Sequence, residues 1–86
     1  MLYYIDTIEQ VKGAGEGEIN EYGSRTKKNS YETALTSYYA SLSNVANDLI
    51  SETTPDKNHY YLDIRIVDST GGVLKKDKLG SLQNQA

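Results

Sequence analysis

Residues 30–51, SYETALTSYYASLSNVANDLIS, decide the fold, because they predict one amphipathic helix from Ser30 to Ser51. Apolar residues recur there at steps of three and four and so form a single stripe along the helix. Ser, Thr and Asn fill most of the other side, and since they are mediocre helix formers, we expect the helix to depend on packing against a sheet. Asn29 or Ser30 caps its start, with Glu32 in a capping-box-like position. The apolar stripe comprises Tyr31, Ala34, Leu35, Tyr38, Leu42, Val45, Ala46 and Leu49.

Two strand-like segments lie on each side of this helix. Tyr60 to Val67 has the clearest alternation of period two in the chain, and Val73 to Leu79 follows it as a short, charged strand. Before the helix, Leu2 to Val11 is rich in aromatic and β-branched residues. Glu18 to Thr26 is a weaker strand, in which Gly23 predicts a bulge or an irregular edge. In the clearest strand, Tyr60, Leu62, Ile64 and Ile66 are predicted on one face, and Tyr61, Asp63, Arg65 and Val67 on the other.

The element order is therefore ββαββ, which predicts a two-layer α+β fold with a single helix packed on a four-stranded antiparallel sheet. A right-handed crossover gives the sheet order 2-1-3-4, with the strands numbered along the chain. This order places the glycine-containing and lysine-rich strands at the edges, where they discourage edge-to-edge pairing. Residues 1–79 form one domain, and residues 80–86 are expected to be a polar, disordered tail. The pattern of the first strand does not decide which of its two faces is buried. One face carries Tyr3, Ile5, Thr7 and Val11, and the other carries Leu2, Tyr4 and Ile8.

Composition excludes several classes of function. The chain has 86 residues and no cysteine, which rules out disulfides, thiolate metal sites and cysteine nucleophiles. A small domain without disulfides fits the cytoplasm, the start lacks the features of a signal peptide, and no apolar run approaches the ~20 residues of a membrane span. A net charge of −3 argues against broad electrostatic binding to nucleic acid or anionic lipid. We expect no enzymatic activity and no cofactor, because the sequence offers no set of catalytic or metal-binding residues.

Two turn-like motifs are similar to known functional motifs, but their sequence context disfavours both functions. Residues 13–17, Gly-Ala-Gly-Glu-Gly, suggest a phosphate-binding loop, but the next element reads as a strand and Glu16 repels phosphate, so a hairpin loop is predicted. Residues 68–71, Asp-Ser-Thr-Gly, suggest the aspartic-protease signature. That chemistry needs two carboxylates that share a proton, so a hairpin turn is predicted instead.

The single histidine, His59, is the remaining candidate for a metal or acid–base site. Its expected partners are Asp56, Asp63 and Asp68. Asp63 belongs to the outward pattern of its strand and Asp68 to a turn, and a lone histidine at the start of a strand is usually solvated. We therefore predict no chemical role for His59.

With only one helix, the second face of the sheet is left uncovered and becomes the candidate interaction surface. The first hypothesis is a non-enzymatic protein–protein interaction module that binds a protein partner, or a second copy, through this face or an edge strand. Tyrosine is enriched in such interfaces, and a charge-neutral tyrosine patch containing Tyr61 would support this hypothesis. The basic run is not one patch, because Lys75 and Lys76 point to opposite faces. The candidate surface comprises Tyr61, Asp63, Arg65, Tyr4, Lys75 and Lys76.

The alternative is an accessory nucleic-acid-binding protein. In this hypothesis Tyr61, with Tyr3 or Tyr4, stacks on bases, and basic side chains contact phosphates. The net charge and the carboxylates expected on the same face, Asp6 and Asp63, disfavour it. The basic residues considered are Arg25, Lys27, Lys28, Lys75, Lys76 and Lys78.

Three segments carry a loose resemblance to other proteins: Tyr3-Tyr4-Ile5, Tyr38-Tyr39, and the hairpin from Asp68 to Lys76. In these segments the chain resembles small uncharacterised proteins from phages and mobile elements of Gram-positive bacteria. Those proteins are similar in a Tyr-rich first strand, a glycine-bearing turn and a Ser/Ala/Tyr-rich helix. The resemblance implies the ββαββ fold and an accessory genomic context. It brings no activity, and no catalytic residue is carried over.

Overall fold

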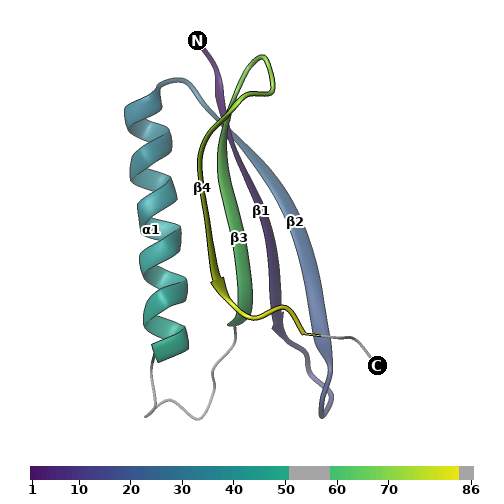
Figure 1. Cartoon of the computed structure of the whole chain (residues 1–86). Coiled ribbons are helices and arrows are strands. Elements are labelled where there is room, and N and C mark those ends of the chain that lie inside the picture. The colour runs from purple at the N-terminus through teal and green to yellow at the C-terminus, as the bar shows by residue number, and fades with distance from the viewer. Residues whose placement is uncertain (51–58, 84–86) are drawn as a thin grey trace.

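In the computed structural model, one helix packs along one face of a four-stranded antiparallel sheet (Figure 1). The structure describes residues 1–50 and 59–83. The strand order is β2-β1-β3-β4, and every neighbouring pair is antiparallel, which confirms the predicted ββαββ architecture and sheet order. The elements are β1 (Tyr3–Lys12), β2 (Ile19–Lys28), α1 (Tyr31–Ile50), β3 (His59–Asp68) and β4 (Val73–Gly80).

The core lies between α1 and the two central strands. The alternation in β3 places Leu62, Ile64 and Ile66 against the helix, and the last two side chains have no exposed surface. In β1, Ile5 joins this core, so the face that also carries Tyr3 is the buried one, and the question that the sequence left open is settled. The helix stripe meets them as predicted: Ala34, Tyr38 and Val45 are buried, and Leu35, Leu42 and Leu49 pack around them.

The start of α1 is capped by Ser30, one of the two predicted residues. The Ser30 hydroxyl accepts a hydrogen bond from the backbone N–H of Thr33 at 3.1 Å. This bond satisfies one of the N–H groups that the first turn of a helix leaves without a partner. The cap therefore fixes where the chain leaves β2 and turns onto the sheet.

The predicted bulge at Gly23 is wrong. Gly23 lies opposite Ile8 in an uninterrupted register between β1 and β2, and β2 continues to Lys28. A Cβ atom at position 23 would meet only the Thr7 carbonyl oxygen, at 3.8 Å, so the regular strand tolerates glycine without requiring it. The register shifts lie elsewhere, next to Val11 in the β1–β3 pair and next to Val67 in the β3–β4 pair.

The two glycine-containing motifs form hairpin turns, as predicted. In the β1–β2 loop, Gly13 donates its backbone N–H to the Glu18 carbonyl at 2.8 Å, and Gly17 has a φ of 73°. In the β3–β4 turn, the Asp68 carboxylate accepts hydrogen bonds from the Thr70 hydroxyl at 2.6 Å and from the Gly72 backbone N–H at 2.8 Å. These hydrogen bonds lower the pKa of Asp68, and the bond from the Thr70 hydroxyl has the largest effect. Asp68 is therefore a turn former.

Gly80 ends β4 in a conformation that an L side chain does not tolerate. Its φ is 75°, and a Cβ atom would lie 2.1 Å from the Tyr60 carbonyl oxygen. We expect Gly80→Ala to lower the free energy of unfolding by about 2–4 kcal/mol, since strain at positive φ is added to a clash with backbone. Urea denaturation measures the loss. Gly17→Ala is the matched control, because Gly17 has a φ of 73° with no atom near its missing Cβ. An equal loss of stability in Gly80→Ala and Gly17→Ala would contradict this prediction, because it would show that the chain relieves the clash at residue 80 without a cost in free energy.

Candidate interaction surface

The sheet face turned away from α1, called the open face below, is the main surface that the fold leaves uncovered (Figure 1). Strand alternation and the cross-strand register decide which side chains lie on it. Asp6 lies opposite both Arg25 and Arg65, and Arg65 lies opposite Lys76, so one row across all four strands is charged. Defined by the rows of the sheet from Tyr4 to Gln10 of β1, the open face comprises Tyr4, Asp6, Ile8 and Gln10 of β1, Glu21, Arg25 and Lys27 of β2, Tyr61, Asp63, Arg65 and Val67 of β3, and Val73, Lys76 and Lys78 of β4.

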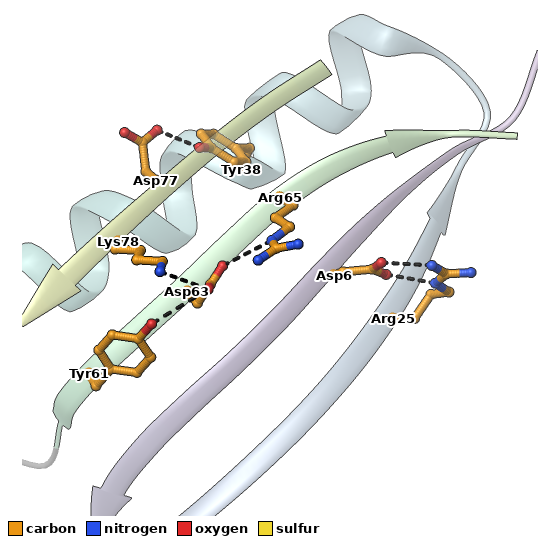
Figure 2. A network of polar contacts seen from close by, with 8 residues as sticks. All are labelled: Asp6, Arg25, Tyr38, Tyr61, Asp63, Arg65, Asp77 and Lys78. Carbon is orange, nitrogen blue, oxygen red and sulfur yellow. Dashed lines mark hydrogen bonds and ion pairs between the residues drawn. The ribbon is translucent and has the colours of Figure 1, made fainter. Parts of the chain in front are cut away.

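At the β1–β2 side of this face, Arg25 lies between the Asp6 carboxylate and the Tyr4 ring. Figure 2 shows the contact between Arg25 and Asp6. Arg25 Nε and Nη2 donate to the two Asp6 oxygens at 2.6 and 2.7 Å, which is a bidentate geometry. These hydrogen bonds are the largest cause of a lowered pKa of Asp6. The Arg25 guanidinium also lies 4.9 Å from the centre of the Tyr4 ring. The Tyr4 ring is therefore already covered by a cation.

At the centre of the face, Asp63 is a nearly buried carboxylate whose side chain is only 10% exposed. Figure 2 shows its contacts with Tyr61, Arg65 and Lys78. Arg65 Nε donates to Asp63 Oδ1 at 3.3 Å, and Lys78 Nζ lies 4.0 Å from Oδ2. The Tyr61 hydroxyl also donates to Asp63, at 3.5 Å. A buried carboxylate needs such partners, because leaving water without them is costly. Arg65 itself stays accessible, with 45% of its side chain exposed.

Basic side chains outnumber acidic ones on the open face. Five basic residues against three carboxylates give a formal charge of +2, although the whole chain carries −3. Among the described residues, Lys76 has no ion-pair partner. The open face is therefore the cationic side of an acidic molecule. The basic residues are Arg25, Lys27, Arg65, Lys76 and Lys78, and the carboxylates are Asp6, Glu21 and Asp63.

The structure brings together five of the six residues predicted for the interaction surface. Tyr4, Tyr61, Asp63, Arg65 and Lys76 lie on the open face. The sixth, Lys75, lies on the helix side, where its Nζ is 5.8 Å from the Tyr38 ring centre and 5.3 Å from that of Tyr39. A charge-neutral tyrosine patch containing Tyr61 would have supported the interaction hypothesis, whereas the surface that forms is charged. Four of its five basic residues, Arg25, Lys27, Lys76 and Lys78, were considered from the sequence as possible phosphate contacts; Arg65 was not among them, and their grouping on one face depends on the cross-strand register.

Behind β4, the phenol of the buried Tyr38 reaches the strand and donates a hydrogen bond to Asp77 (Figure 2). Burial, and then this bond, raise the pKa of Tyr38. A hydrogen bond with Tyr39 is the largest cause of a raised pKa of Lys75. Lys75 and Asp77 are thus engaged with the helix, while Lys76 and Lys78 on the same strand face the opposite way.

The end of the described chain lies across one end of the open face. Gln10 Oε1 accepts the backbone N–H of Gln83 at 2.7 Å, and Gln10 Nε2 donates to the Gln83 carbonyl at 3.1 Å and to Glu21 Oε2 at 3.1 Å. Ser81 donates its backbone N–H to the Tyr60 carbonyl at 3.0 Å. Residues 81–83 of the expected tail are thus hydrogen-bonded to the sheet. The expectation of disorder at residues 84–86 lies outside the described residues.

His59 has partners other than those expected from the sequence. Its Nδ1 lies 3.0 Å from Asp48 Oδ2 of α1, and the same oxygen accepts its backbone N–H at 2.8 Å. Its Nε2 lies 3.6 Å from Glu9 Oε2 of β1. Asp63 is on the open face and Asp68 is in the β3–β4 turn, so neither joins it, and Asp56 lies outside the described residues. Only 21% of the His59 side chain is exposed, so the expectation of a solvated histidine is wrong, because tertiary contacts hold the ring.

A polar groove of about 380 Å³ runs from His59 between α1 and the first two strands. Its walls carry hydroxyl and amide groups, and the Thr7 and Ser24 hydroxyls are hydrogen-bonded at 2.5 Å. Within the described part of the chain, no group of three or more His, Cys, Asp or Glu side chains is arranged to hold a metal ion. The contacts of His59 with Asp48 and Glu9 join α1 and β1 to the start of β3. The groove is lined by Ile5, Thr7, Glu9, Ser24, Thr26, Lys28, Ser37, Ser41, Asn44, Val45, His59 and Leu62.

Comparison with protein-family models, with curated proteins and with solved structures finds no match to this chain. Across residues 1–50 and 59–83, the structure contains no helix that is both long and apolar enough to cross a membrane.

Proposed function

We propose that this protein is a small non-enzymatic binding module whose open face binds an acidic surface of a partner protein. The observation that supports it is the concentration of basic side chains on the open face, at +2, in a chain of −3. Opposite charges on two surfaces steer their encounter and reject partners of the wrong sign. A protein surface with mostly carboxylates and a few basic groups complements this pattern of five cations and three anions.

Two contacts favour a protein over a nucleic acid as the partner. The Tyr4 ring lies under the Arg25 guanidinium, so this tyrosine is not presented as a free stacking platform. The Tyr61 hydroxyl is bonded to Asp63, which places a carboxylate beside the second tyrosine, where it would repel a phosphate. Asp6 and Asp63 also stand between the basic side chains and would repel successive phosphates. A nucleic-acid partner remains the second hypothesis. Both kinds of binding weaken as salt rises, so a direct comparison of affinities for an acidic peptide and a nucleic acid separates the two.

The test compares a polyglutamate peptide with a single-stranded oligonucleotide of equal charge as probes, using NMR shifts and fluorescence anisotropy. We expect saturable binding of the peptide, with shifts at Arg65 and Lys76. Lys76→Glu is expected to weaken it about tenfold or more, which corresponds to about 1.4 kcal/mol. Lys28→Glu is the matched control, because it makes the same charge change on the helix side, in the wall of the polar groove.

Three results would contradict the proposal. The first is absence of saturable peptide binding. The second is an equal loss of peptide affinity in Lys76→Glu and Lys28→Glu. This result would mean that the total charge of the protein, rather than the open face, determines binding. The third is tighter binding of the oligonucleotide than of the peptide at the same salt concentration, which would favour the nucleic-acid hypothesis.

A further inference from the structure

The free edge of the sheet at β4 adjoins an apolar hollow. Strand β4 pairs with β3 on one side, and no described strand pairs with its other side. A hollow of about 420 Å³ lies on the helix side of this edge, between α1 and β4. Its lining is mainly apolar, in contrast to the polar groove on the other flank of α1. The hollow is lined by Tyr39, Leu42, Ser43, Ala46, Asp77 and Leu79.

The apolar lining of this hollow is partly accessible, since Tyr39 is 51% exposed. An unpaired strand edge beside an apolar groove is the geometry in which proteins bind extended peptides, because the backbone supplies hydrogen bonds and the groove accepts every second side chain. The β4 edge therefore has both parts of a strand-addition site.

The charge of β4 decides which strand fits. A second copy of β4 is unsuitable, because an antiparallel pair related by a two-fold axis at any of residues 75–78 places a lysine opposite a lysine. Lys76 and Lys78 lie on the open-face side of the strand, whereas the hollow lies on the helix side. An incoming strand thus meets Lys76 and Lys78 on one face and the apolar hollow on the other, where the Lys75 ammonium lies 5.3 Å from the centre of the Tyr39 ring. Asp77, the carboxylate in the hollow, is already hydrogen-bonded to Tyr38.

We propose that β4 binds an extended segment of the partner protein as a fifth strand of the sheet. In this segment acidic side chains alternate with large apolar ones, so that the acidic ones face Lys76 and Lys78 and the apolar ones enter the hollow beside α1. The inference rests on the proposed function and specifies the partner and its mode of binding. A segment of about seven residues spans β4.

The experiment uses a synthetic seven-residue peptide of alternating leucine and glutamate, and compares it with two peptides of equal composition. In one, the backbone nitrogens that would face β4 are methylated; in the other, the leucines and glutamates are grouped in two blocks. Binding is followed by anisotropy, and backbone pairing by hydrogen exchange of the β4 amides in the whole protein. We expect the alternating peptide to bind and to protect β4 amides, and both comparison peptides to bind about tenfold or more weakly.

A matched pair of variants tests the hollow. Ala46 lines the hollow and Asn44 lines the polar groove on the other flank of α1. We expect Ala46→Glu to weaken binding of the alternating peptide about tenfold or more, and Asn44→Glu to leave it within about twofold. Equal binding of the methylated peptide, or equal effects of the two variants, would overturn strand addition. If acidic peptides bind in a Lys76-dependent way under either result, the proposed function survives; if no acidic peptide binds, both proposals fail.

Discussion

Ile64→Ala is expected to lower the free energy of unfolding by about 3–4 kcal/mol, because it removes three buried carbons from the centre of the sheet. Ile64 has no exposed surface and lies in β3 directly under α1. A domain of this length has about 4–13 kcal/mol of stability in total, so the loss is a large part of it. Urea denaturation and thermal melting measure the change, and the melting temperature is expected to fall by about 15–25 °C.

The control for this prediction is Ile8→Ala, which makes the same chemical change on the open face, where the side chain is 47% exposed. We expect it to cost less than about 1 kcal/mol. Ile64→Val is expected to fall between the two, at about 1 kcal/mol. If Ile8→Ala and Ile64→Ala cost the same, the core does not lie between α1 and β3.

Tyr38→Ala is the second large effect, expected at about 3–5 kcal/mol, because it leaves a cavity where a whole ring is buried. Tyr22→Ala removes the same ring from β2, where it is 53% exposed, and is expected to cost about 1 kcal/mol or less. Tyr38→Phe keeps the ring and loses only the hydrogen bond to Asp77, so about 1–2 kcal/mol is expected. A loss in Tyr38→Phe as large as in Tyr38→Ala would show that the hydrogen bond, and not the packing, dominates.

The same tyrosine makes stability depend on alkaline pH. Burial and the Asp77 bond raise the pKa of Tyr38, so the folded state favours the neutral phenol. This contribution is fully present below the pKa of an unfolded tyrosine, about 10, and is lost as pH rises from there through the folded pKa. Urea titrations at about pH 8 and about pH 11 should therefore show the advantage of the wild-type chain over Tyr38→Phe shrinking at the higher pH. An advantage that grows would contradict the raised pKa.

The topology could be predicted because local patterns and sheet rules agree for these residues. The alternation of Leu62, Ile64 and Ile66 identifies a strand with one buried face, and the stripe through Ala34 and Tyr38 supplies its cover. The strands that are richest in apolar residues, β1 and β3, take the central positions of the sheet, and the more polar β2 and β4 take the edges. The prediction of a bulge at Gly23 was wrong, since an edge strand accepts glycine without a change of register. The register shifts that do occur lie next to Val11 and Val67, residues that are ordinary in a regular strand and so gave no signal.

The candidate surface was only partly predictable. Membership of the open face follows from alternation, so Tyr61, Asp63 and Arg65 could be placed there. Which charges become neighbours depends on cross-strand register, and this sets Asp6 between Arg25 and Arg65. The hollow beside β4, the partners of His59 and the Gln10–Gln83 contact all depend on how the helix and the last residues lie on the sheet. No pattern within a single segment encodes such contacts.

The hydrogen bonds between Gln10 and Gln83 also bear on the order in which the molecule folds. They join residues that are 73 positions apart in the sequence. Closing so long a loop costs conformational entropy, and this cost is offset only once the two central strands, β1 and β3, have paired in register. The β1–β2 hairpin, by contrast, is local and can form early. Without residue 83, the Gln10 amide keeps its hydrogen bond to Glu21 in the hairpin but loses both bonds to Gln83. We therefore expect this contact to close only after β1 and β3 have paired, as one of the last steps of folding.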